Sequence, residues 1–143
     1  MYKVKAKNRE HLKQLIAEAI QEKGPECSLN FIDVSSVSDM RGMFYASKFN
    51  GDISEWDVSS VRNMDHMFSD SPFNGDISKW DVSSVVDMKY MFADSSFNGD
   101  ISRWDVSNVR NMYRMFAHSQ FKGDISLWNF SSVSEMSYIF SDY

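Results

Sequence analysis

Apolar and aromatic residues recur along this chain with a fixed period of 24 residues. The stretch FNGDISEWDVSSVRNM begins at Phe49, and a near copy, FNGDISKWDVSSVVDM, begins at Phe73. The pattern divides residues 31–143 into a partial unit and four full units: 31–48, 49–72, 73–96, 97–120 and 121–143. A fixed period of this length is typical of a solenoid, in which each unit buries its apolar face against its neighbours.

Each unit contains two kinds of apolar spacing. Ile53, Trp56 and Val58 follow the apolar-x-x-apolar-x-apolar pattern with which leucine-rich repeats build a short strand. Apolar positions in 61–68 then recur at intervals of three and four, which predicts a short helix, and Ser60 is its expected N-cap. The predicted fold is therefore an α/β repeat solenoid, a leucine-rich-repeat-like stack of short parallel strands and short helices.

Residues 1–30 differ from the repeats. The segment YKVKAK alternates apolar residues with lysines, which suits an edge strand. An apolar stripe from Leu12 to Ile20 follows, with Asn8 as its N-cap and Gly24 as its stop, and predicts a helix. We expect this strand and helix to form an N-terminal cap on the first open face of the solenoid. The same stripe would suit a helix on a membrane surface, but the mixed charges of its polar face favour the cap.

Composition narrows the class of protein. A chain of 143 residues, 43% hydrophobic and with a net charge of -5, fits one globular domain. The acidic balance disfavours nucleic acid as a partner. The start lacks a secretory signal, and no window approaches the roughly 18 apolar residues of a membrane span, so we expect a cytoplasmic protein with no membrane contact. The single cysteine, Cys27, has no partner for an internal disulfide and is expected to be inert.

The repeated motif FNGDISxWDVSSVxxMxxMF, over residues 31–143, resembles the Met/Trp-rich branch of the BspA-type bacterial leucine-rich repeat proteins. The resemblance implies a right-handed solenoid that binds other macromolecules, and it implies a place on the cell surface. It supplies no catalytic residues. Since no spacing in the chain marks a nucleophile elbow, a phosphate loop or a zinc site, we expect neither an enzyme nor a cofactor.

Aspartates form two columns at the repeat spacing, one containing Asp57 and the other Asp52. Strands about 5 Å apart would bring like carboxylates together, so something must compensate their repulsion. Calcium is one explanation, but it needs about six to eight oxygens per ion. The interpretation we favour is an Asx-type turn, in which Asp57 accepts from Ser59 and Ser60. No metal is then expected.

Partner binding is expected where the repeats differ, because the repeated positions already hold the stack. The candidate residues of the predicted sheet face are Phe31, Glu55, Lys79, Arg103, Leu127, Asp57, Asp81 and Asp105. Those of the predicted helical face are His66, Lys89, Tyr90, Tyr113, Arg114 and Tyr138, with Arg62 and Arg110 one turn away. Tyr and Arg dominate interface hot spots, so another protein is the expected partner. Stacking of nucleic-acid bases on the tyrosines is the alternative that the acidic charge disfavours.

The last unit has no capping segment, which predicts an open apolar end. We expect this end to form a homodimer, and the alternative is a monomer in which tyrosines shield it. The candidate residues for self-association are Leu127, Trp128, Phe130, Ile139, Phe140 and Tyr143.

The function predicted from the sequence is a non-catalytic protein–protein interaction module. The alternative is a small acidic inhibitor, or nucleic-acid mimic, that blocks the basic groove of a host or defence enzyme. The salt dependence of the affinity for a partner would separate these two functions, because an inhibitor that binds through its carboxylates would lose affinity steeply as salt is added.

Overall fold

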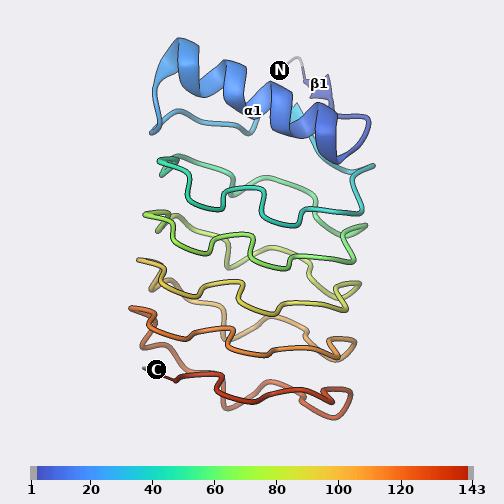
Figure 1. Cartoon of the computed structure of the whole chain (residues 1–143). Coiled ribbons are helices and arrows are strands. Elements are labelled where there is room, and N and C mark those ends of the chain that lie inside the picture. Colours follow the sequence, from blue (N-terminus) through green and yellow to red (C-terminus); the bar gives the residue numbers. More distant parts are fainter. Residues whose placement is uncertain (1–2, 142–143) are drawn as a thin grey trace.

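The computed structural model describes residues 3–141. Within them the helices and strands are β1 (Val4–Lys5), α1 (Arg9–Lys23) and β2 (Ile32–Asp33). β1 and β2 pair in parallel, with Val4 opposite Ile32. From there the chain makes successive circuits that lie one beneath another, while α1 lies across the top of the stack (Figure 1). We call each circuit of 24 residues a coil.

The helix α1 begins and ends where its sequence signals lie. The Asn8 side chain accepts from the His11 N–H at 2.9 Å, and the N–H of Gly24, whose φ is 92°, donates to Ile20 O at 2.8 Å. These contacts confirm the predicted N-cap and stop. The side chains that α1 buries are Leu12, Ile16 and Ala19. No helix in residues 3–141 has the length and apolar content that a bilayer crossing requires.

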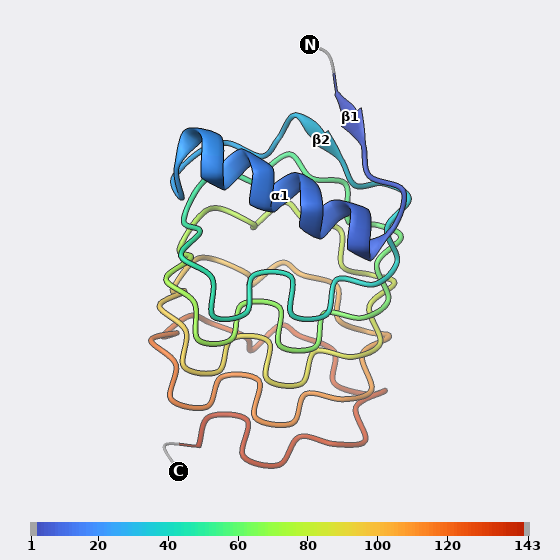
Figure 2. The same ribbon diagram turned by 45° about the horizontal axis from the view of Figure 1, so that its top comes forward.

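The guanidinium of Arg9 fixes the first turn of α1 to the coil below it. Its Nε and Nη2 both donate to Arg41 O, at 2.9 and 2.7 Å. Figure 2, in which the top of the molecule comes forward, shows α1 running across the uppermost coil.

Parallel backbone hydrogen bonds join each coil to the next. In the central part of the stack, the N–H groups of Met64, His66, Phe68 and Asp70 donate to the carbonyls of Asp87, Lys89, Met91 and Ala93, at 2.9, 3.0, 2.9 and 2.9 Å. Parallel bridges at the same spacing run from Asp39–Asn63 to Asn111–Glu135. Every second residue of this segment therefore directs its N–H along the stack rather than within its own coil.

The predicted short helix is replaced by consecutive β-turns. Met67 N donates to Met64 O and Ser69 N to His66 O, both at 3.1 Å, so these bonds span three residues instead of four. His66 and Asp70 have φ values of 59° and 52°, and a left-handed residue at every fourth position ends any helix. This succession of turns buries positions three and four apart, as a helix does, so the apolar spacing alone did not distinguish the two.

The predicted strand at residues 53–58 is also a pair of turns. Trp56 N donates to Ile53 O at 3.2 Å, and Val61 N donates to Val58 O at 2.9 Å. In residues 3–141 most of the isolated parallel bridges lie along the column of Asn63 and its equivalents, on the side of the coil where a helix was expected, while one joins Ser28 to Asp52. A strand at the predicted place is found in the partial unit, where β2 lies 24 residues before Trp56 and Asp57. Asp52 and Asp57, at the two ends of this segment, accept local hydrogen bonds from Ser54 and Ser59, and these bonds favour turns over the strand that the apolar spacing predicted.

The centre of each coil is filled by aromatic and methionine columns. The Trp80 indole Nε1 donates to Ile53 O of the preceding coil at 3.1 Å, which satisfies its polar atom inside the core. Phe68 and Phe92 stack with ring centroids 5.6 Å apart. The buried members of the tryptophan and first methionine columns are Trp56, Trp80, Trp104, Trp128, Met40, Met64, Met88 and Met112. Their burial confirms that these columns serve packing.

We predict that Gly51→Ala destabilises the protein more than Gly99→Ala does. A Cβ at Gly51 would lie 1.8 Å from Cys27 O, a backbone atom that has no rotamer to adopt. A Cβ at Gly99 would meet only the Phe97 ring below 3 Å, and it would lie 3.6 Å from Gly75 O. We expect losses of at least about 3 kcal/mol for Gly51→Ala and about 1–3 kcal/mol for Gly99→Ala, measured by urea unfolding. Equal losses would contradict this backbone contact.

Candidate binding surfaces

Two faces of the stack present the positions that vary between coils. We call residues 52–60 and their equivalents in other coils the aspartate face, and residues 62–70 and their equivalents the tyrosine face. The aspartate face corresponds to the predicted sheet face and the tyrosine face to the predicted helical face. Both consist of turns, so the side chains of each face project from bent backbone.

On the aspartate face, each aspartate accepts hydrogen bonds from the serine two residues later. Asp57 Oδ1 accepts from Ser59 N at 3.0 Å and from Ser59 Oγ at 2.6 Å. These bonds confirm the Asx-turn interpretation, with Ser59 rather than Ser60 as the donor. The other aspartates that accept from both groups of a serine are Asp33, Asp76, Asp81, Asp100 and Asp105. In residues 3–141, no three acidic, histidine or cysteine side chains come together in an arrangement that would hold a metal ion.

The residues that the sequence predicted for this face form one variable column, and the aspartates Asp57, Asp81 and Asp105 form a second column beside it. Glu55, Lys79 and Arg103 are exposed, Phe31 is half-buried, and Leu127 is exposed at the far end. A small hollow of about 150 Å³ is lined by Ser54, Glu55, Asp76 and Lys79. The variable column is acidic at Glu55 and basic at Lys79 and Arg103, so this face offers mixed charge rather than one continuous field.

The tyrosine face brings together the aromatic candidates. His66 and Tyr90 stack with centroids 4.4 Å apart, and Tyr90 meets Tyr113 edge-on at 5.5 Å. Arg114 lies over the ring of Tyr113 at 5.5 Å and over that of Tyr138 at 5.0 Å. We call this set the aromatic row, and its members are Tyr45, His66, Tyr90, Tyr113, Arg114 and Tyr138.

Tyr45 begins the row and was not among the sequence candidates. Its ring meets His66 edge-on at 6.0 Å, and 55% of the residue is exposed. A hollow of about 450 Å³ beside it is lined by Arg9, Arg41, Gly42, Tyr45, Asp65 and His66. The sequence does contain a signal for Tyr45, because the other coils have a small residue at its position: Ser69, Ala93, Ala117 and Ser141.

Fixed charges surround the row. Lys89 Nζ lies 3.8 Å from Asp65 Oδ2 and 3.9 Å from Asp87 Oδ2, and Asp65 also contacts the His66 ring. The Lys89 side chain is therefore held between two carboxylates from neighbouring coils, and it contributes to the shape of the face rather than to a free positive charge.

Four members of the row have a backbone conformation that costs free energy. His66, Tyr90, Arg114 and Tyr138 have φ values of 59°, 58°, 50° and 59°, at the position where the first coil has Gly42. The left-handed region costs about 1–2 kcal/mol for a residue other than glycine. A bulky side chain at these positions is not required for the core, because none of the four is buried. The same conformation recurs at Ala46, Asp70, Asp94 and His118, so it belongs to the repeated turns of the coils, and the row is distinguished by the bulky side chains that it keeps there.

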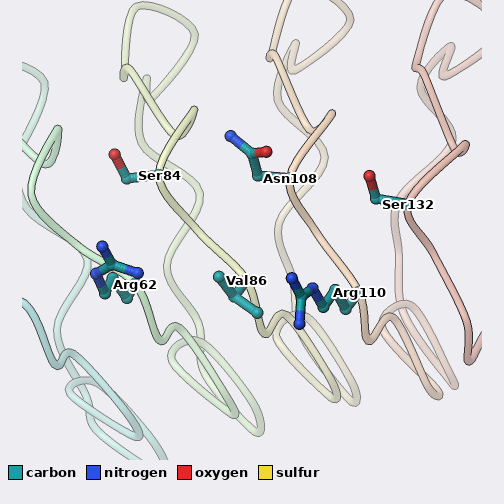
Figure 3. Close-up of a pocket in the computed structure, with 6 residues that line it drawn as sticks. All are labelled: Arg62, Ser84, Val86, Asn108, Arg110 and Ser132. Carbon is teal, nitrogen blue, oxygen red and sulfur yellow. The ribbon is translucent and has the colours of Figure 1, made fainter.

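A corner groove between the two faces was missed by the sequence reasoning. Figure 3 shows Arg62, Val86 and Arg110 in one row, with Ser84, Asn108 and Ser132 in a second row beside it. The groove has a volume of about 320 Å³. Because no helix follows them, the Ser84 column does not contain N-caps as predicted. The signal for the groove was the appearance of arginine in alternate coils at one position.

The end of the stack exposes apolar residues. Leu127 is 81% exposed and Phe140 is 51% exposed, while Phe130 and Ile139 are half-buried. Trp128 is buried against the coil above it, where its indole donates to Ile101 O, so it is not available for self-association as proposed from the sequence. Tyr143 lies outside the described residues.

A family model described as Mycoplasma protein of unknown function, DUF285, matches residues 11–96 and again residues 69–143. The two matches overlap and together extend from within α1 to the last coil. Neither the curated proteins nor the solved structures include a match to the chain.

We predict opposite orders of stability at two neighbouring tyrosines. Tyr90→Gly should be more stable than Tyr90→Ala by about 0.5–1 kcal/mol, because glycine relieves the left-handed conformation. At Tyr113, which has no positive φ, Tyr113→Ala should be the more stable variant. Urea unfolding of the four variants measures both differences, and the same order at the two positions would contradict the assigned conformations.

The serine bonds of the aspartate face predict an acid-sensitive stability. The hydroxyl and the N–H of Ser107 hold the pKa of Asp105 below its ordinary value of 3.8. A folded pKa below the unfolded one stabilises the protein above the unfolded pKa, and this stabilisation is lost as the pH falls through the folded pKa. We therefore expect the free energy of unfolding to fall as the pH drops below about 4.

The variant Ser107→Ala tests the cause of this shift. NMR titration should show a higher pKa for Asp105 in the variant, while the pKa of Asp57, which is lowered by Ser59, stays where it is in the parent. An unchanged pKa of Asp105 in Ser107→Ala would show that Ser107 does not cause the lowered pKa.

Proposed function

Because this chain belongs to the DUF285 family, whose description as a Mycoplasma protein of unknown function assigns no activity, we propose a function from the geometry of its own surface. The proposed function is a non-catalytic protein–protein interaction module. Its main binding surface is the aromatic row of the tyrosine face.

The observation that supports this proposal is the retention of large side chains at strained positions of the row. Tyr and Arg supply large contact area with few rotatable bonds, and they dominate the free energy of protein interfaces. The rings are already packed edge to face or stacked before a partner arrives. A partner that binds this row would therefore order few side chains, which reduces the entropy cost of association.

The hollow beside Tyr45 gives the row a concave end. It lies where Arg9 of α1 meets the first coil through Arg41 O, so the N-terminal segment contributes directly to the surface. A partner side chain that enters this hollow would contact Tyr45 and His66 together. We propose this hollow as the anchor point and the remaining row as the extended contact.

We extend the proposal to the class of fold. The 24-residue register of the bridges and the stacked coils support a repeat solenoid of the leucine-rich-repeat-like class, related to the BspA-type proteins. On this proposal the strand and helix of each leucine-rich-repeat unit are replaced by turns, while the stacking of units is kept. The partner would then be reached either in the cytoplasm or at the cell surface.

A second proposal concerns the aspartate face. Its carboxylates are held ionised by their serine bonds, as the lowered pKa values of Asp57, Asp76 and Asp105 indicate. Columns of carboxylates at coil spacing support an acidic inhibitor that occupies a basic groove of another protein. Lys79 and Arg103 interrupt this acidic surface, so we place this function second.

Affinity capture from the source cells with the full chain, followed by calorimetry on the purified partner, tests the main proposal. Tyr45→Ala combined with Tyr113→Ala should weaken binding by about tenfold to a hundredfold, since neither residue is at a strained position and both are in the row. Lys79→Glu combined with Arg103→Glu on the aspartate face is the matched control and should bind as the parent does.

Three outcomes would overturn the proposal: failure to retain any protein specifically, loss of the partner with the control variant alone, and a steep loss of affinity in salt with no effect of the tyrosine variant. The last outcome would favour the inhibitor. Unfolding curves of both variants exclude loss of structure as the cause.

A further inference from the structure

The corner groove contains two arginines, Arg62 and Arg110. Within residues 3–141, neither Arg62 nor Arg110 forms an ion pair or a side-chain hydrogen bond through its guanidinium, and both are exposed. The acid next in sequence to the groove, Asp87, is committed elsewhere, because its Oδ1 accepts from Lys89 N and its Oδ2 lies near Lys89 Nζ. The groove is therefore a local site of positive charge on a chain of net charge -5.

The spacing of the two arginines is set by the stack. They occupy the same position in coils that are two apart, with Val86 between them. Hydrogen-bonded parallel segments lie about 4.8 Å apart, so the two positions are separated by about 10 Å along the stack. A guanidinium binds a carboxylate through two parallel hydrogen bonds, so each arginine suits one carboxylate.

One peptide conformation places two carboxylates at that separation on one side. A polyproline II helix has three residues per turn and rises about 3.1 Å per residue, so side chains three apart point the same way and lie about 9 Å apart. In an extended strand, residues three apart point to opposite sides. A polyproline II helix has no internal hydrogen bonds, so its carbonyls are free to accept hydrogen bonds from the second row of the groove.

That second row offers polar groups. The hydroxyls of Ser84 and Ser132 form no hydrogen bond within the described residues, and Asn108 is held in place by the bond from its Nδ2 to Ser83 O at 2.7 Å. Val86 is half-buried and offers an apolar contact between the two arginines. The residues between two acids of a bound peptide would lie over Val86, which favours proline there.

We propose that the corner groove binds an acidic, proline-containing segment of a partner protein, in the polyproline II conformation, with carboxylates three residues apart on Arg62 and Arg110. This deepens the proposed function and rests on it, because it names the chemistry of one partner segment. A nucleic acid is disfavoured, since its continuous negative charge would also meet the aspartate columns next to the groove.

Three peptides of equal charge test the spacing: Gly-Glu-Pro-Glu-Gly, Gly-Glu-Pro-Pro-Glu-Gly and Gly-Glu-Pro-Pro-Pro-Glu-Gly, each with blocked ends. NMR titration of the full chain follows the Nε–H signals of Arg62 and Arg110. We expect the Glu-Pro-Pro-Glu peptide to bind about fivefold to tenfold more tightly than the other two, and Arg62→Gln or Arg110→Gln to weaken it by a similar factor.

A charge reversal provides the sharpest control. Arg110→Glu should lose affinity for the Glu-Pro-Pro-Glu peptide and should bind a peptide in which one of the two glutamates is replaced by lysine. Equal affinity for the three spacings, unchanged binding in the arginine variants, or tighter binding of a single-stranded oligonucleotide at the same two arginines would overturn the proposal.

The peptide titration and the test of the aromatic row can fail independently of each other. The Tyr45→Ala, Tyr113→Ala variant should titrate with the peptide as the parent does, because neither residue lines the groove. If the Glu-Pro-Pro-Glu peptide does not bind while the tyrosine variant still loses its protein partner, the groove proposal is wrong and the proposed protein–protein interaction function is supported. If the peptide binds as predicted and the tyrosine variant keeps its partner, the aromatic row is wrong as the main surface.

Discussion

Backbone hydrogen bonds between consecutive coils determine where every side chain of the stack lies. The N–H of Tyr90 donates to Tyr113 O at 2.9 Å, and equivalent bonds join the other coils at the same offset. Because the offset is constant, like residues form columns, and a slip of one residue would take the buried side chains of a coil out of their columns. The aromatic core supports this register, since each tryptophan indole donates to a carbonyl of the coil above.

The same constraint divides the sequence between scaffold and surface. Buried columns repeat because each coil must match its neighbours, and the exposed aspartates of the Asx turns repeat with them, whereas other positions that face outward vary from coil to coil. The aromatic row and the corner groove both arise from this freedom. Each is built from side chains of several coils, so neither exists in a single unit. Tyr90 and Arg114 keep bulky side chains where the backbone is left-handed, a conformation that glycine adopts at lower cost.

The sequence predicted the period, the buried columns, the limits of α1 and the Asx turns at Asp57, because each depends on residue type at fixed spacing. It did not predict the turns of residues 61–68. Their apolar spacing is that of a helix, and the direction of each N–H depends on the next coil rather than on the local sequence. The corner groove was missed for a related reason: Arg62 and Arg110 become one site only when the register between coils is known.

The segment around Tyr90 donates its hydrogen bonds to the next coil, and through-hydrogen-bond scalar couplings measure this pairing directly. We expect couplings from the amide nitrogens of residues 88, 90, 92 and 94 to the carbonyl carbons of residues 111, 113, 115 and 117. Both proposed surfaces require this pairing. Couplings from the same nitrogens to carbonyls four residues earlier in the chain would show a helix and would contradict the account.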